Sequence, residues 1–146
     1  MLGKTLEDYE LFIYALQDQY PGVRTATLTV IRQASNVATV EGALYFDAGV
    51  RLQVLEVVRF DVIPPRIARY GYEVWRDNEK LYWYDPQGHP NEPALASTHP
   101  HHKHIPPDIK HHRIPAPGLS FTGPNLPVLI REIEALISSD EITPDG

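Results

Sequence analysis

Residues 23 to 85 alternate between apolar and polar side chains, and this pattern limits the fold more than any other feature of the chain. Successive side chains of a strand point to opposite faces, so alternation predicts half-buried β-strands. The connections between the alternating segments are short, which favours antiparallel neighbours. The sequence therefore predicts a five-stranded antiparallel meander, with strands over residues 23–33, 37–46, 50–63, 66–76 and 81–85.

A helix is expected on each side of this meander. Near both ends of the chain, apolar residues recur every three or four positions, the spacing of one buried helical stripe. Thr5 and Asn125 precede these segments and are suitable N-cap residues. The apolar stripe of the second helix should cover the open face of the sheet. The expected organisation is one α+β domain over residues 1–146, with helix 5–20, sheet 23–85, a long Pro/His-rich loop 86–122, helix 125–138 and a flexible tail 139–146.

Composition narrows the classes of function. The chain has 146 residues, no cysteine and a formal charge of −6, so disulfides and thiolate metal sites are excluded, and nonspecific coating of nucleic acid is disfavoured. No apolar run approaches the ~20 residues of a membrane span. The first residues lack the pattern of a secretory signal. We therefore expect a cytoplasmic protein that does not enter a membrane.

The histidines are concentrated in one place. All seven lie between His89 and His112, and six of them lie in residues 98–113, together with two lysines and an arginine. Prolines on both sides of this stretch disfavour a helix and favour extended backbone. We predict an ordered extended loop that lies across the last strands of the sheet.

Extended backbone sends alternate side chains to opposite sides. His102 and His104 should therefore share one face of this loop. Lys103, with His99 and His101, should lie on the other face. Whichever face turns toward the sheet carries imidazoles.

A metal site is one interpretation of this loop. Neutral imidazole is a common ligand of zinc and of other divalent transition metals. The spacing matches none of the zinc signatures that a helix sets, and Lys103 would place a positive charge beside the cation. The candidate ligands are His99, His101, His102 and His104, with Glu56, Asp85 or His89 as a further ligand if the fold brings one near.

Acid-base chemistry on RNA, without a metal or another cofactor, is the leading interpretation. Cleavage through the 2′-hydroxyl needs a base, an acid and cations on the phosphate. His101, His102 and His104 are the acid-base candidates, and Glu56 is a base or an orienting carboxylate. Candidate substrate-binding residues are Lys103 and Arg113 for the phosphate, Tyr70 and Tyr72 for base stacking, and Asp85.

Two other interpretations remain open. The histidine loop could be the docking surface of a non-enzymatic protein that binds a metal or a protein partner. The histidines and the strand aromatics could also be purely structural, which for Tyr82 and Trp83 is the better interpretation.

Several of these segments together resemble the TumE family of toxins from bacterial toxin–antitoxin modules. The similarity covers roughly residues 20 to 137. Where the family tends to place an arginine before the aspartate at the end of a strand, this chain has Tyr84. The residues that carry the resemblance are Leu52 and Glu56, Tyr70-Gly71-Tyr72, Tyr84-Asp85 followed by His89-Pro90, and the run His101-His102-Lys103-His104 before a closing helix.

The resemblance implies a small growth-inhibiting protein. It also implies neutralisation by a separately encoded antitoxin with a helix-turn-helix domain, and a suspected action on RNA. Homodimerisation is left open.

Overall fold

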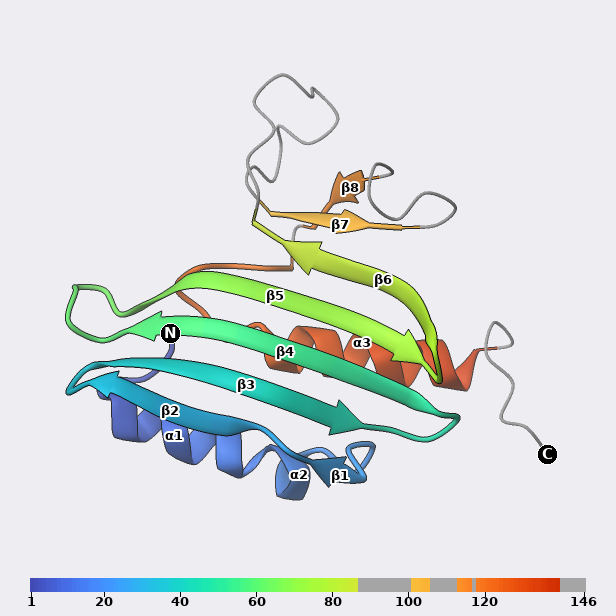
Figure 1. Ribbon diagram of the computed structural model, residues 1–146, viewed down its shortest axis with the longest axis horizontal. Helices are drawn as coiled ribbons and strands as arrows, with labels where there is room; N and C mark the ends of the chain where they lie inside the picture. Colours follow the sequence, from blue (N-terminus) through green and yellow to red (C-terminus); the bar gives the residue numbers. More distant parts are fainter. Residues whose placement is uncertain (87–100, 106–112, 117, 140–146) are drawn as a thin grey trace.

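The computed structural model describes residues 1–86, 101–105, 113–116 and 118–139. Its centre is one antiparallel sheet of eight strands, and helices cover one face of that sheet (Figure 1). The helices are α1 (Leu6–Tyr14), α2 (Leu16–Gln19) and α3 (Leu126–Ser138). The predicted α+β class is confirmed, with eight strands in the described part of the chain in place of the five expected.

The strands follow the chain in order, except at the first edge. The sheet runs β1-β3-β4-β5-β6-β7-β8, and β2 also pairs with β3. Every pairing is antiparallel, and between residues 23 and 85 this agrees with the prediction from the short connections. The strands are β1 (Thr25–Ala26), β2 (Thr29–Ala34), β3 (Val37–Tyr45), β4 (Val50–Arg59), β5 (Arg66–Arg76), β6 (Glu79–Asp85), β7 (His102–His104) and β8 (Arg113–Pro115).

The first additional strand arises because the segment predicted over 23–33 is broken. Thr27 and Leu28 separate β1 from β2, and both lie against Gly42 of β3. Gly42 has φ of +134°, and a Cβ there would lie 2.4 Å from the Thr27 carbonyl oxygen. The break therefore depends on a glycine that lets two backbones approach closely.

The other two additional strands come from the histidine segment. We expected a loop that lies across the sheet, but β7 pairs with β6 at the sheet edge, and β8 pairs with β7. The edge of β6 would otherwise present unpaired N–H and C=O groups, and β7 satisfies them. The histidine segment therefore extends the sheet.

Other predicted boundaries also change. The helix expected over 5–20 is divided into α1 and α2 at Ala15, and the long third strand ends at Arg59. The hairpin after β3 turns at Gly49 with φ of +72°, as predicted. Residues 140–146 of the expected tail lie outside the described residues.

The helices pack on the same face of the sheet. Tyr9 of α1 and Asn125, the residue before α3, both belong to one hydrogen-bonded group around Glu56 of β4. Thr5 caps α1, as predicted, through a reciprocal bond pair with Asp8. The Asn125 side chain does not cap α3. The apolar stripe of α3 is buried against the sheet through Leu126, Leu129, Ile130 and Ile133.

The register defines two faces that matter for the site. The helix face carries Val54, Tyr72 and Tyr84, which are aligned across β4, β5 and β6. The open face, on the other side, carries the aligned residues Glu73 and Trp83.

None of the helices among the described residues is long and apolar enough to span a membrane.

Candidate functional site

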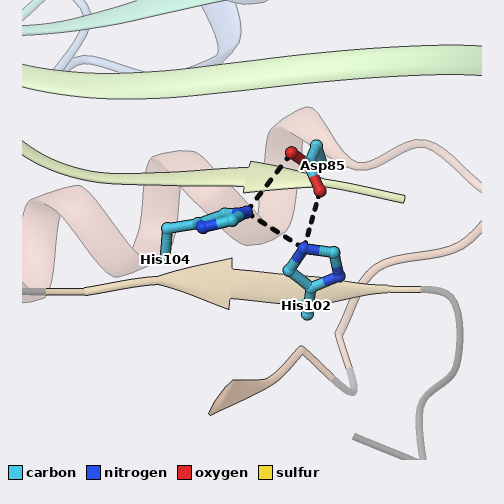
Figure 2. A group of neighbouring side chains, drawn as sticks. All are labelled: Asp85, His102 and His104. Carbon is cyan, nitrogen blue, oxygen red and sulfur yellow. Dashed lines mark hydrogen bonds and ion pairs between the residues drawn. The ribbon is translucent and has the colours of Figure 1, made fainter. Parts of the chain in front are cut away.

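Three side chains from β6 and β7 converge at the edge of the open face. Asp85 ends β6, and its direct partner across the strand pair is His102. The His102 Nε2 atom lies 2.7 Å from Asp85 Oδ1, and His104 Nε2 lies 3.3 Å from Asp85 Oδ2. The two Nε2 atoms are 3.0 Å apart (Figure 2). We call Asp85, His102 and His104 the Asp-His-His cluster.

Strand geometry brings the two histidines together. Residues two apart on a strand point to the same face, which places His102 and His104 side by side. The edge of the Trp83 ring lies against His104, with ring centroids 4.8 Å apart. The exposed fractions are 1% for the His102 side chain and 2% for His104, whereas Asp85 is 31% exposed. The cluster is therefore largely buried and opens to solvent at the carboxylate.

With Asp85 ionised, protons on the two Nε2 atoms cannot satisfy all three contacts. A neutral imidazole has one ring N–H, and a protonated ring nitrogen cannot accept a hydrogen bond. If only His102 Nε2 carries a proton, His104 Nε2 and Asp85 Oδ2 are two acceptors that face each other. If both Nε2 atoms carry protons, the two N–H groups face each other. With an ionised Asp85, a cation placed between the three groups would therefore satisfy all of them.

Glu56, the predicted catalytic carboxylate, is on the other side of the sheet. It is fully buried on the helix face and accepts hydrogen bonds of 2.5 Å from the Tyr9 and Tyr72 hydroxyls. Burial raises the pKa of Glu56, and these two hydrogen bonds oppose the rise. The expected meeting of Glu56 with the histidines is therefore not found, because strand alternation directs Glu56 into the core.

The predicted base-stacking tyrosines are core residues. Tyr72 is fully buried, and the Tyr70 ring stacks on it with centroids 4.9 Å apart. Burial, and secondarily the Asp85 charge, raises the pKa of the Tyr70 hydroxyl. Neither ring has a free face for a nucleotide base, because the helix face is covered.

His101 belongs to a different group from the other two described histidines. Its Nδ1 shares a 2.5 Å hydrogen bond with the Tyr70 hydroxyl, and its ring packs on Tyr70 and Phe121. This packing anchors the chain just before β7. Among the predicted acid-base histidines, the structure therefore pairs His102 with His104 and separates His101 from them.

Lys103 points to the helix face, away from the cluster, as the alternation predicted. Its Nζ atom lies 3.6 Å from Glu132 of α3 and 4.0 Å from the centroid of the Tyr82 ring. The Tyr84 hydroxyl donates to the same carboxylate at 2.6 Å. Burial and the Glu132 charge raise the pKa values of Tyr82 and Tyr84. Lys103 therefore joins β7 to α3, and its predicted role on a phosphate is not supported by this position.

Sequence reasoning did not single out two residues that pack against the β6 and β7 pair. Glu132 is one of several charged residues on an amphipathic helix, and its contacts with Lys103 and Tyr84 on the helix face distinguish it. Trp83 lies on the open face, where its ring packs against His104. No local sequence signal marks either role.

The remaining predicted residues are placed only in part. Arg113 pairs with His104 through the backbone of β8. His99 and His89, named as metal-ligand candidates, lie outside the described residues.

A separate hollow of about 790 Å³ lies on the open face over β2 to β5, and no residue of the Asp-His-His cluster lines it.

Comparisons with known proteins place the chain in a family. No curated protein and no solved structure matches it. A family model described as toxin TumE matches residues 13–137, a range that contains all strands of the described residues and the whole Asp-His-His cluster. Because this match covers most of the chain, the protein belongs to the TumE toxin family.

Proposed function

We propose that this toxin-family protein cleaves RNA, and that the Asp-His-His cluster is its reacting centre. Membership of the family makes the chain a toxin-like protein of a toxin–antitoxin module and implies an antitoxin partner. The observation that carries the proposal is the convergence of two imidazoles and one carboxylate within 3.3 Å of one another. Imidazole is the side chain best suited to move protons near neutral pH.

The chemistry would use the 2′-hydroxyl of the RNA. One imidazole takes the proton of this hydroxyl, and the 2′-oxygen attacks the adjacent phosphorus. The bond to the 5′-oxygen breaks, and the second imidazole protonates that leaving oxygen, which leaves a 2′,3′-cyclic phosphate and a 5′-hydroxyl. Asp85 orients the rings and stabilises the imidazolium. Arg113 stays a prediction for the phosphate.

The metal-independent form of this mechanism requires the two imidazoles to hold different protonation states while they are 3.0 Å apart. The shared carboxylate supports that arrangement, because it stabilises the one positive charge that the pair would carry. The proton count described above also suits a bound cation in the same place. RNA cleavage measured with chelator and with added metal distinguishes the metal-independent form from the metal-bound form.

The antitoxin is proposed to be a separately encoded protein with a helix-turn-helix domain. A gene for such a protein beside the gene for this chain, and a stable complex of the two on a sizing column, would support it. The same column shows whether the toxin alone forms a homodimer.

RNA cleavage by the purified chain tests the proposed activity. We expect wild-type protein to cleave single-stranded RNA and His102→Ala to lose about 100-fold or more of the rate, as for loss of a general acid or base. His101→Ala is the matched control, because His101 is the neighbouring imidazole and lies outside the cluster. Intact RNA at every pH between about 5 and about 9, with chelator and with added zinc or manganese, contradicts the proposal.

A non-enzymatic binding module is the second candidate. The low exposure of both imidazoles favours it, since a buried pair is more accessible to a small ion than to a nucleic acid. Tight metal binding without RNA cleavage would support this candidate over the first.

A further inference from the structure

The three contacting groups of the Asp-His-His cluster have the dimensions of a metal site. The shortest separations are 2.7 Å from His102 Nε2 to Asp85 Oδ1, 3.0 Å between the two Nε2 atoms and 3.3 Å from His104 Nε2 to Asp85 Oδ2, so the two Asp85 contacts use different oxygens. One ligand atom from each of the three residues lies within 4.8 Å of the other two. Ligands at about 2.0–2.1 Å from a metal ion are about 2.9 Å apart at octahedral angles and about 3.3 Å apart at tetrahedral angles. The shortest separations lie around these values, so an ion fits between the groups if Asp85 binds it through both oxygens or turns one oxygen toward it.

The electron pairs also favour an ion. With Asp85 ionised, each placement of protons on the two Nε2 atoms leaves like groups facing each other, whereas a cation accepts a lone pair from every group. Both imidazoles are almost fully buried, so the histidine side of the site would shield a bound ion from solvent. Among the residues that the structure describes, Asp85, His102 and His104 are three potential ligands that lie close enough together to hold a metal ion.

The objection raised by Lys103 does not apply to this geometry. Its ammonium group lies on the helix face against Glu132 and the Tyr82 ring, on the other side of the strand from His102 and His104. The ammonium group of Lys103 is therefore paired with Glu132 and does not lie beside an ion bound at the cluster.

We propose that Asp85, His102 and His104 bind one divalent transition-metal ion, with zinc as the best-fitting probe. Two imidazoles and one carboxylate suit zinc, iron(II) and manganese better than calcium or magnesium, which prefer oxygen donors. The 31% exposure of Asp85 gives the site access to solvent, so water can occupy a further coordination position. This inference concerns binding and stands whether or not RNA is the substrate.

Binding of Zn²⁺ and Co²⁺ to the untagged full chain tests the inference. Metal-free protein prepared with chelator is titrated with each ion, and binding is followed by calorimetry and, for Co²⁺, by its visible absorption. We expect one equivalent to bind, with a Co²⁺ spectrum typical of four or five nitrogen and oxygen ligands. The unfolding temperature should rise when Zn²⁺ is added, because the ion binds the folded state.

Variants assign the ion to this cluster. Asp85→Asn keeps the shape of the side chain and removes its charge, and His102→Ala removes one ligand; each should weaken Zn²⁺ binding by about 100-fold or more. His101→Ala should bind as wild type does. The far-ultraviolet circular dichroism of each metal-free variant verifies that it is folded.

Two results would overturn the inference. One is a folded wild-type protein that binds neither ion at micromolar concentration. The other is a pattern among the variants that assigns the ion to different groups, seen as equal loss of binding in His101→Ala and His102→Ala or as unchanged binding in Asp85→Asn. If the protein binds metal but does not cleave RNA, the proposed activity is wrong and this inference stands. If the protein cleaves RNA in chelator and binds no metal, this inference is wrong and the proposed activity stands.

Discussion

The Tyr72 hydroxyl donates a 2.5 Å hydrogen bond to Oε2 of Glu56, and both side chains are fully buried. Tyr9 of α1 donates to the other carboxylate oxygen at 2.5 Å, and Asn125 donates to the Tyr72 hydroxyl at 3.1 Å. The carboxylate thus connects β4, β5, α1 and the start of α3. A buried polar group that is fully hydrogen-bonded stabilises one arrangement of its neighbours, and this network orients both helices on the sheet.

Glu56→Gln should remove the part of the pH dependence of folding stability that comes from this carboxyl group. Burial raises the pKa of Glu56 above 4.5 in the folded protein, so folding favours the protonated form. The stability that this group contributes is complete below about pH 4.5 and is lost as the pH rises through the folded-state pKa, at up to about 1.4 kcal/mol per pH unit. Glutamine has no charge to bury. Urea unfolding between pH 4 and 8 should therefore show the variant gaining on wild type as the pH rises.

Glu41→Gln is the control for this measurement, because Glu41 is exposed on the neighbouring strand β3 and reports the loss of a surface charge. If wild type instead gains on Glu56→Gln as the pH rises, the folded protein prefers the ionised carboxylate. That outcome contradicts the raised pKa.

Tyr72→Phe should destabilise the fold by about 1.5–3 kcal/mol, since it removes a hydrogen bond to a buried acid and leaves one carboxylate oxygen without this donor. Tyr45→Phe is the control at an exposed tyrosine, where a change within about 0.5 kcal/mol is expected. Chemical denaturation at neutral pH measures both. Equal effects of the two substitutions would mean that the Glu56 network contributes little.

Gly42→Ala should destabilise the protein by about 1–3 kcal/mol from backbone strain, with a further cost for the contact of the new Cβ with Thr27. Gly71→Ala is a matched control, because a Cβ at Gly71 has open space and needs no positive φ. Its expected effect is neutral or slightly stabilising. Thermal unfolding of the two variants compares them directly, and a neutral Gly42→Ala would contradict the close approach of β1 and β2 to β3.

Lys103 and Glu132 should be coupled weakly and favourably. Their side chains are 20% and 34% exposed, so solvent screening limits the ion pair to about 0.5–1 kcal/mol. Lys103→Met keeps the packing on Tyr82 and removes the charge. A double-mutant cycle with Glu132→Gln isolates the pair. A coupling energy of zero would show that only packing holds β7 against α3.

The sequence indicated the local elements well because they depend on short-range periodicity. Alternation located β3, β5 and β6, and the same rule placed His102 and His104 on one face and Lys103 on the other. The period of three to four residues located α3 within one residue of its observed start. These properties follow from the geometry of an isolated strand or helix, so the chain alone determines them.

Strand count and strand ends were harder to obtain from the sequence. The break between β1 and β2 depends on the approach of Thr27 to Gly42, and β7 becomes a strand only because β6 offers it an edge. Both are contacts between segments that are distant in the chain. Local propensity does not report such contacts.

The partners of the histidines were decided by the tertiary structure. Asp85 was one of several acids that could have met them, and the alignment of Asp85 with His102 across β6 and β7 selects it. Glu56 was excluded because the helices cover its face of the sheet and the Tyr9 and Tyr72 hydroxyls bind it. The chain by itself determined which side chains share a face, because alternation is local. Only the folded sheet decided which faces meet, because register and layer packing arise from interactions between distant segments.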